Sequence, residues 1–562
     1  MTVHCRQALQ LCCDYASNRL QPFSTVPAVG DPSCQPLLTG WTKILNIAIL
    51  NSYFESPIEE REAPMLRTGA EYLAAIKDGR KIYVGSELVR DVTEHAAFRN
   101  SARSFAEIYD RKRSAENAEI TSYEENGERY SAWFLKPVDR DGLRKRAEAH
   151  RLVASWTYGL LGRSPDHVAS FLTGLAMCPE LFESNRGGFG KNLTDYYDRM
   201  RRQDLFACYV VVAPQGARNP EMYARKTSIA HGLQVTAEKD DGIILNGMKL
   251  LGTGAAFSDE IWIGNLLPLS PDQKAQAVTC AVPTAANGVS LWVRKPFEKY
   301  AVTPFDSPFS SRFDESDAVA IFDEVKVPWE RVFLLDDVQQ SREMYFRTPS
   351  HVMGNHQSIV RYHEKLKIIL GFAYKAAEMN NVLQVPAVRE ALSKLAVAEA
   401  GLRGWIAGQI EDAETFSPYL HVNRRQLYAA LNWCTNSYYQ ITESVREMLG
   451  AGPFLMPADV SALTDPALRQ TFERYWAAGE ASAIDRLKLM KLAWDYLGSD
   501  FAARHTQYER FYAGPQFVHA FYNFNNCPWD EHKRHVEDLM SGMEVPDVSE
   551  EKPLRSAGGS PR

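Results

Sequence analysis

The stretch Phe206-Ala207-Cys208-Tyr209-Val210-Val211-Val212 marks the place where the sequence pattern changes from helical to β-prone. Its β-branched and aromatic side chains, uninterrupted by charge, are typical of a buried strand. Before it, residues 144–161, 168–176 and 193–203 carry apolar side chains at three- and four-residue spacing, which predicts helices. We therefore expect a helical N-terminal domain at 65–205, followed by a β domain.

The pattern after this stretch predicts more strands, separated by Gly, Pro and Asn clusters. Asp241-Gly242 and Asn246-Gly247 are turn dipeptides that bracket the first of these strands. The β domain is expected to cover residues 206–345. Its further strands are predicted at 243–245, 260–263, 277–282, 289–293 and 318–322.

Helical periodicity returns in the C-terminal part of the chain, where two apolar stripes predict two long helices. Pro386 is placed to begin the second of them. The expected C-terminal domain is an antiparallel helical bundle at 346–540, followed by a disordered tail at 541–562. Residues 1–64 lack persistent periodicity and are expected to be a poorly ordered leader or to lie upstream of the native start. The stripes are residues 366, 369, 370, 373 and 377, and residues 388, 392, 395, 402, 406 and 410.

Composition excludes several classes of function. The 562 residues carry a formal net charge of −7, so no general affinity for nucleic acid or an anionic membrane is expected. No apolar run approaches the roughly 20 residues that a membrane helix needs. The nine cysteines form no C-x-x-C pair, and the polar N-terminus lacks a signal peptide, so we expect a reducing, cytoplasmic location.

Several short motifs of known binding and catalytic sites are incomplete or absent in this chain. Residues 187–191 read GGFGK but lack the remaining residues of a phosphate-binding loop, and residues 252–257 lack the third glycine of a dinucleotide fingerprint. The 13 histidines include no compact metal-ligand spacing, so no metal is predicted. No G-x-S-x-G nucleophile elbow is present.

Three longer stretches of sequence are far more specific for one family than these short motifs. In chain order they are LLGRSPDH at 160–167, SSRFDE at 310–315 with FDEVKVPWERVF at 322–333, and AWDYLGS at 493–499 with YERF at 508–511. Together they resemble the 4-hydroxyphenylacetate 3-monooxygenase oxygenase family, and the resemblance runs from about residue 67 to about residue 520.

The resemblance implies an α+β protein with an acyl-CoA dehydrogenase-like fold: a helical N-terminal domain, a central β-barrel and a C-terminal four-helix bundle. It also implies a flavin-dependent monooxygenase for a small aromatic substrate. In such enzymes a separate NAD(P)H-flavin reductase supplies reduced FAD (FADH2). This reacts with O2 to a C4a-hydroperoxide, which hydroxylates the carbon ortho to a phenol. A homodimer or homotetramer is expected through the bundle.

A phenol hydroxylase needs a cation, a hydrogen-bonding group and a base near the phenol oxygen. Arg163 is the candidate cation. A positive charge just before the helix predicted at Pro165 is unfavourable with the helix dipole, so its presence there indicates a role other than stabilising the helix. The family places a Tyr four residues after this Arg and a His in the strand after Asp-Leu, whereas this chain has His167 and Tyr209. The imidazole and the phenol are thus exchanged, and each residue is equally consistent with a structural role.

Further site residues are implied by the resemblance. His356 matches a family position that acts as a general base in the chlorophenol branch, and the Leu266-Leu267 pair stands where relatives bind the substrate tail with Ser-Thr. This pair favours a more apolar substrate. The residues expected to contact FAD are Tyr209, Val212, Gln215, Thr253, Leu497, Gly498 and Ser499.

Three alternatives remain open from the sequence. One is a 4-hydroxybutyryl-CoA dehydratase with an iron-sulfur cluster, which the lack of cysteine between Gly162 and Met177 disfavours. The second is an ordinary acyl-CoA dehydrogenase. The third is a non-catalytic flavin-binding scaffold, suggested by the exchange at 167 and 209.

Overall fold

The computed structural model describes residues 66–214 and 232–543. The predicted leader at 1–64, Gln215 and the last part of the tail lie outside the described residues. All described residues belong to one compact unit, Glu62–Arg562, so the predicted domain boundaries within it stay predictions. None of the helices in the described ranges is long and apolar enough to cross a membrane.

Helices dominate residues 66–202, as the periodicity predicts. The first is held by a capping box: the Thr68 hydroxyl accepts from the backbone N–H of Glu71, whose carboxylate accepts from the backbone N–H of Thr68. The helices in residues 66–202 are α2 (Gly69–Ala75), α3 (Arg99–Arg113), α4 (Ala118–Thr121), α5 (Arg140–Trp156), α6 (Pro165–Leu175), α7 (Glu183–Arg186) and α8 (Phe189–Arg202).

Helix α6 is the element that positions the site. Pro165 occupies its first turn, where a missing N–H costs nothing, and Ser164 precedes it in extended conformation. All eleven residues of α6 are buried, because the helix packs against the C-terminal helix α11 (Ser350–Met379) on one side and against β5 (Ala207–Val210) on another. The residues just before α6 are therefore held inside the protein.

Most of the described strands belong to two β-sheets. The larger has the strand order β2-β1-β10-β11-β7-β6 and the smaller β12-β9-β8-β5. The remaining bounds are β1 (Ile82–Val84), β2 (Glu87–Val89), β6 (Gln234–Lys239), β7 (Gly242–Lys249), β8 (Glu260–Ile263), β9 (Val278–Pro283), β10 (Val289–Val293), β11 (Ala318–Pro328) and β12 (Val332–Leu335). Two separate hairpins join β3 (Ser122–Glu125) to β4 (Glu128–Ser131) and β13 (Glu414–Phe416) to β14 (Tyr419–His421).

The strand pairing corrects two details of the prediction. Both sheets end in edge strands, so the described strands form two open sheets rather than a closed barrel. Strand β1, from the part of the chain predicted to be helical, pairs in parallel with β10. A strand's neighbours depend on long-range contacts, which local periodicity does not report.

The dipeptide Asn246-Gly247 lies inside β7 and is not a turn. The register of β7 against β11 shifts between Phe322 and Val325, and the Asn246 side chain spans the irregularity. Its amide donates to Glu324 Oε1 at 2.7 Å and accepts from the backbone N–H of Glu324 at 2.9 Å. The dipeptide therefore serves a β-bulge, for which a glycine at φ +121° is suited.

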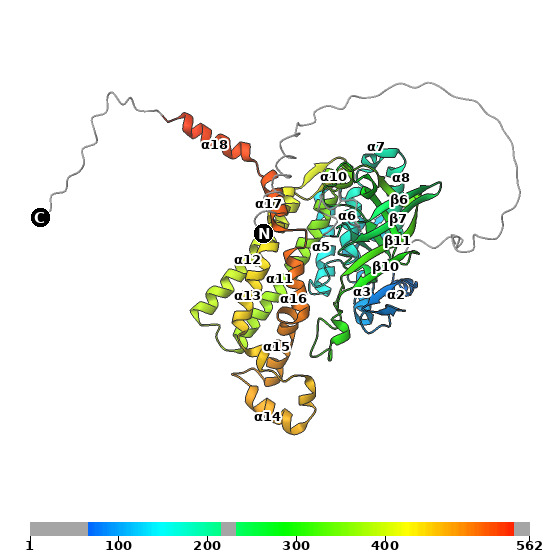
Figure 1. The fold of residues 1–562 in the computed structure, drawn as a ribbon. Helices are drawn as coiled ribbons and strands as arrows, with labels where there is room; N and C mark the ends of the chain where they lie inside the picture. The colour runs from blue at the N-terminus through cyan, green and yellow to red at the C-terminus, as the bar shows by residue number, and fades with distance from the viewer. Residues whose placement is uncertain (1–65, 215–231, 544–562) are drawn as a thin grey trace, which may run out of the picture. The chain divides into compact units, whose positions relative to one another are not determined.

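The C-terminal part is helical, as the apolar stripes predict. Helix α12 begins at Pro386, which confirms the expected start, and α11, α12 and α13 pack against one another, with α16 against α13 (Figure 1). Besides α11, the helices are α10 (Gln340–Arg347), α12 (Pro386–Glu411), α13 (Arg424–Leu449), α14 (Pro466–Trp476), α15 (Ala483–Leu497), α16 (Asp500–Arg510), α17 (Gln516–Asn525) and α18 (Trp529–Ser541).

Candidate active site

Arg163 lies in the turn before α6 and is only 8% exposed. Its backbone N–H donates to Glu315 Oε2 at 2.9 Å, and its Nη2 donates to the backbone oxygen of Tyr512 at 3.1 Å. Its Nη1 atom is buried and has no hydrogen-bond partner among the described residues. A buried donor without an acceptor is costly, so this nitrogen is suited to bind a ligand oxygen.

Three tyrosine rings surround this guanidinium. Its carbon lies 4.2 Å from the ring centroid of Tyr512, 5.2 Å from that of Tyr209 and 5.5 Å from that of Tyr508. Burial opposes the charge of Arg163, but the three tyrosines and Glu315 outweigh burial and raise its pKa above the ordinary value. The site therefore holds a permanent cation flanked by aromatic rings.

His167 stands in the first turn of α6 and is 1% exposed. Its Nδ1 lies 3.0 Å from Oε1 of Gln357 on α11, and its Nε2 is buried without a partner among the described residues. Burial, followed by the charge of Arg163, lowers the pKa of His167 well below the usual range. The imidazole is therefore neutral near pH 7 and has one free nitrogen.

Tyr209, on β5, connects His167 with Arg163. Its ring centroid lies 5.5 Å from that of His167 and 5.7 Å from that of Phe171 on α6. Burial raises the pKa of the Tyr209 hydroxyl, which Arg163 partly offsets. The two residues whose identities are exchanged relative to the family pattern are thus neighbours, so an imidazole and a phenol still share one place in the fold.

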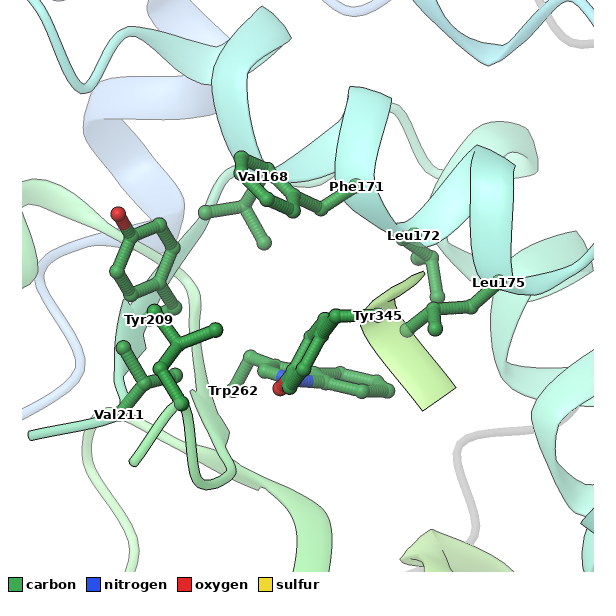
Figure 2. Close-up of a pocket in the computed structure, with 9 residues that line it drawn as sticks. Val168, Phe171, Leu172, Leu175, Tyr209, Val211, Trp262 and Tyr345 are labelled. Carbon is green, nitrogen blue, oxygen red and sulfur yellow. The ribbon is translucent and has the colours of Figure 1, made fainter. Parts of the chain in front are cut away.

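An apolar pocket adjoins this cluster and contains about 310 Å³ of empty space, its open mouth included. In Figure 2, Val168 and Phe171 of α6 lie on one side of it and Trp262 and Tyr345 on the other. The Tyr345 hydroxyl accepts from Trp262 Nε1 at 3.0 Å, so this polar atom is engaged. The pocket is lined by Val168, Phe171, Leu172, Leu175, Tyr209, Val211, Trp262, Leu266 and Tyr345, none of which is charged.

An apolar pocket beside a cation and a neutral imidazole agrees with two family matches. The family described as 4-hydroxyphenylacetate 3-hydroxylase N terminal matches residues 68–334, and its C-terminal counterpart matches residues 341–541. The chain belongs to the 4-hydroxyphenylacetate 3-hydroxylase family. This confirms the family inferred from the three strings.

Two curated relatives within the family illustrate its range. The chain is 31% identical to the 4-hydroxyphenylacetate 3-monooxygenase oxygenase component of Thermus thermophilus over 84% of this chain and 97% of that protein. It is 32% identical to the oxygenase component of a Rhodococcus 4-nitrophenol 2-monooxygenase over 80% of this chain and 86% of that protein.

Solved structures agree with these matches. A 4-hydroxyphenylacetate 3-monooxygenase oxygenase component in complex with FAD and 4-hydroxyphenylacetate matches with a TM-score of 0.80 at 29% identity, over 84% of this chain and 98% of that one. A 4-hydroxybutyryl-CoA dehydratase from N. maritimus matches over 88% of this chain and 98% of that one, with a TM-score of 0.75 at 16% identity, which shows a shared fold alone. The expected fold class is thereby confirmed.

Thr253, a residue that the family pattern assigns to FAD, lies in a buried loop behind Arg163. Its hydroxyl donates to Asp317 Oδ1 at 2.6 Å, and Arg504 donates to both oxygens of Asp317 at 2.6 and 2.8 Å. Burial works in the opposite direction, but Arg504 and Arg294 lower the pKa of Asp317 far below its usual range. The carboxylate therefore stays charged and fixes the Thr253 loop.

The next residue of this loop, Gly254, packs against the turn that carries Arg163. Its backbone has φ +79°, and a Cβ built on it would lie 3.2 Å from the backbone oxygen of Arg163. Glycine is suited to both demands, the left-handed backbone and the close approach. The Thr253 loop therefore packs directly against the turn that carries Arg163.

The other described residues predicted for FAD contact neighbouring parts of the protein. The Val212 backbone oxygen accepts from the N–H of Leu250 at 2.8 Å. Leu497 ends α15, Gly498 follows, and Ser499 caps α16, with its hydroxyl accepting from the Ala502 N–H at 3.2 Å. The predicted Gly-Ser kink is therefore a junction between two helices. Among the described residues no hydrogen bond joins this segment to Arg163, so its role in FAD binding stays a prediction.

His356 is not brought to this cluster. Its Nδ1 lies 2.8 Å from Oε1 of Gln409 on α12, and burial lowers its pKa to about 3. One residue along a helix turns the side chain by about 100°, so His356 faces α12 while its neighbour Gln357 faces α6. The ring of His167 packs against Phe171 and Tyr209 of the pocket lining, whereas His356 has no ring contact with a lining residue among the described residues. The general-base role of His356 therefore stays a prediction that this geometry does not favour.

Several residues of the cluster escaped the sequence analysis. Tyr508 has a buried hydroxyl without a partner among the described residues, and a Cβ at Gly162 would lie 2.1 Å from it. Glu315 accepts from the Arg163 backbone and from Arg504 Nη1 at 2.8 Å. Tyr508 and Glu315 belong to the strings that carry the resemblance, so their clustering there was the available signal. Gln357 had no such signal.

Proposed function

We propose that this protein is the oxygenase component of a two-component system that hydroxylates a phenol with reduced FAD and O2. The observation that carries the proposal is the pair of unpartnered buried atoms, Arg163 Nη1 and His167 Nε2, beside an apolar pocket in a chain of this family. A donor and an acceptor without partners are what a phenol O–H group can satisfy at once.

The roles of the residues follow from their chemistry. The aromatic ring of the substrate enters the pocket between Phe171 and Trp262, and its oxygen meets Arg163 and His167. The neutral imidazole accepts the phenol proton at Nε2, and the guanidinium stabilises the negative charge left on the oxygen. A phenolate ring is richer in electrons than a phenol ring, which favours its attack on an electrophilic oxygen.

A further unpartnered polar atom suits the polar edge of a flavin ring. Tyr508 Oη is a buried donor without an acceptor in the described ranges, and its ring contacts Arg163, whose turn packs against the Thr253 loop. Thr253, Tyr209, Val212 and the segment 497–499 would hold FAD, together with Gln215 as the family pattern implies. When bound, reduced FAD supplies the electrons for oxygen activation. The polypeptide then has to exclude water, which the apolar lining achieves.

The pocket supports a substrate class. Leu266 lines it, and none of the nine lining side chains carries a charge. A carboxylate tail would find no cationic partner there, whereas an alkyl or other apolar substituent would bury its surface favourably. We therefore propose a phenol with an apolar substituent as the preferred substrate.

The membership in this family supports a separate reductase as the partner that supplies reduced FAD. A homodimer or homotetramer and a cytoplasmic location remain part of the proposal. The five cysteines in the described ranges, 178, 208, 280, 434 and 527, are unpaired, which suits a reducing compartment.

The test combines flavin and product measurements. Purified protein is equilibrated with reduced FAD under nitrogen and mixed with oxygenated buffer, with and without 4-ethylphenol. We expect bound FAD to reoxidise at a rate different from free FAD, and a 1,2-dihydroxy product to form. Tight FAD binding without product from any phenol would support the scaffold alternative, and tight binding of a CoA ester would support the dehydrogenase alternative.

A further inference from the structure

Gln357 on α11 links the candidate base to a buried carboxylate. Its Oε1 lies 3.0 Å from His167 Nδ1, and its Nε2 lies 3.4 Å from both Asp166 Oδ1 and Ser164 Oγ. The side chains of all four residues are buried, and Gln357 is 1% exposed. No water is needed to complete this chain of contacts.

Asp166 decides which way the Gln357 amide points. Asp166 acts as an acceptor here: its Oδ1 accepts from the Ser164 hydroxyl, and its Oδ2 faces the His150 ring nitrogen at 2.7 Å. Turning the amide would place its oxygen against the carboxylate. The amide therefore directs its NH2 group toward Asp166 and its oxygen toward His167.

The amide oxygen in turn decides the tautomer of His167. Because this oxygen can only accept, the proton of the neutral imidazole must sit on Nδ1. The free electron pair is then on Nε2, the atom that is buried without a partner. The opposite tautomer would leave Nδ1 and the amide oxygen facing each other without a proton.

We propose that Gln357 is a positioning residue that keeps His167 in the Nδ1–H tautomer, so that Nε2 can take the proton of the phenol. This inference rests on the proposed function. The O–H bond of the substrate breaks, its electron pair stays on oxygen beside Arg163, and the proton forms the second N–H bond of His167. The proton returns to the oxygen when the product leaves.

The surroundings of His167 favour the return of this proton. Burial is the main influence that destabilises the imidazolium, followed by the charges of Arg163 and Arg361, with a smaller effect from His150. The rings of Tyr209 and Tyr512 pack against the imidazole at centroid distances of 5.5 and 6.1 Å. Gln357 is the group that opposes these influences, because its oxygen holds the Nδ1 proton.

The tautomer can be measured without turnover. Nitrogen-15 solid-state NMR spectra of protein labelled at histidine would be compared for the wild type, Gln357→Met and Gln409→Met. Gln409 is the matched control, since it makes the same contact with His356 at 2.8 Å. We expect Gln357→Met to convert one bare Nε2 signal into a tautomer mixture. An unchanged spectrum, or a wild type with His167 protonated on Nε2, would overturn the inference even if the enzyme hydroxylates phenols.

Kinetics give the second readout. With saturating reduced FAD, Gln357→Met should lower kcat at least about 10-fold, with a smaller effect on KM, while Gln409→Met changes kcat less than about 3-fold. Gln357→Glu should have a higher kcat than Gln357→Met at low pH, because its un-ionised carboxyl group can donate to Asp166 and accept from His167. This kcat should fall as the pH rises and the introduced carboxyl group ionises. This variant also serves if Gln357→Met fails to fold. Equal losses in both Met variants, or no rescue by Glu, would contradict the proposal.

Discussion

Two regions of this protein are built from the same three residue types, histidine, glutamine and arginine, and they differ in what surrounds them. In the first, His167 contacts Gln357 and lies near Arg163. In the second, His356 contacts Gln409 and lies near Arg146 of α5. Both imidazoles are buried, have lowered pKa values and leave Nε2 without a partner in the described ranges.

The arginines differ in how their charge is used. Arg146 donates to the backbone oxygens of Trp133 and Leu135 and to Ser170 Oγ, and burial lowers its pKa to about 10. Arg163 keeps Nη1 free, and tyrosine rings with Glu315 raise its pKa. Burial of a neutral histidine is thus not a sign of function. The free cation and the adjoining apolar pocket distinguish the first region.

The largest expected effect is on the two histidines themselves. His167→Phe should reduce hydroxylation by about 10²–10⁴-fold, because the proton acceptor is lost. His356→Phe should leave kcat within about 3-fold, since its partner is Gln409 of α12 and, unlike His167, it has no ring contact with a residue of the pocket lining in the described ranges. Steady-state product formation at saturating reduced FAD measures kcat of both variants. Similar losses of kcat would mean that His167 and His356 do not differ in their contribution to catalysis.

The next largest effects are expected at the two arginines. Arg163→Met should lower kcat by about 10²–10³-fold, because the charge that stabilises the phenolate is removed. It should also raise the pKa of His167, which Arg163 lowers. Arg146→Met should instead cost about 1–3 kcal/mol of stability by leaving buried carbonyls unpaired. Activity assays and urea unfolding of both variants separate these effects, and a fully active Arg163→Met protein would contradict the assignment.

The exchanged pair offers a sharper comparison. His167→Tyr and Tyr209→His alone should each lower activity, and the double variant should recover at least about 10-fold over the weaker single variant, because the two rings are in contact. That recovery corresponds to a coupling free energy of about 1.4 kcal/mol or more in a double-mutant cycle. Additive losses would mean that the two residues act independently.

Stability should respond to pH through both buried imidazoles alike. The pKa of His356 is about 3 in the folded protein and 6.5 ordinarily, so the unfolded chain binds more protons between these values. The contribution of His356 to the free energy of unfolding is complete above pH 6.5. It declines as the pH falls toward 3, by about 1.4 kcal/mol per pH unit. His356→Asn should flatten this slope by one proton, as urea unfolding between pH 5 and 7 would reveal. An unchanged slope would mean that His356 is charged when folded.

The smallest expected effect concerns substrate choice. Replacing the pair Leu266-Leu267 by Ser-Thr should shift kcat/KM toward 4-hydroxyphenylacetate and away from 4-ethylphenol by about 10-fold, because hydroxyls can bind a carboxylate. The ratio of kcat/KM for the two substrates is compared within each variant, so a general loss of activity cancels. An unchanged ratio would place the substrate tail elsewhere.

Much of the fold was predictable from local pattern. The helices at 144–161, 168–176 and 193–203 appear as α5, α6 and α8, because burial of one face imposes a period of 3.6 on the sequence. The strands β6 and β12 were missed, since short strands with few apolar residues or beside a Pro-Trp turn carry little periodicity. The open sheets and the bulge at Asn246-Gly247 depend on pairing between distant strands.

The sequence by itself determined the order of helical and β regions, the family, and Arg163, His167 and Tyr209 as a candidate set, because periodicity and the three strings are properties of the chain. Only the tertiary structure decided that these three side chains meet, that His356 faces α12, and that Gln357 completes the cluster from α11. The physical reason is that adjacent residues on a helix point about 100° apart, so the packing of the helices selects which of them reaches the site.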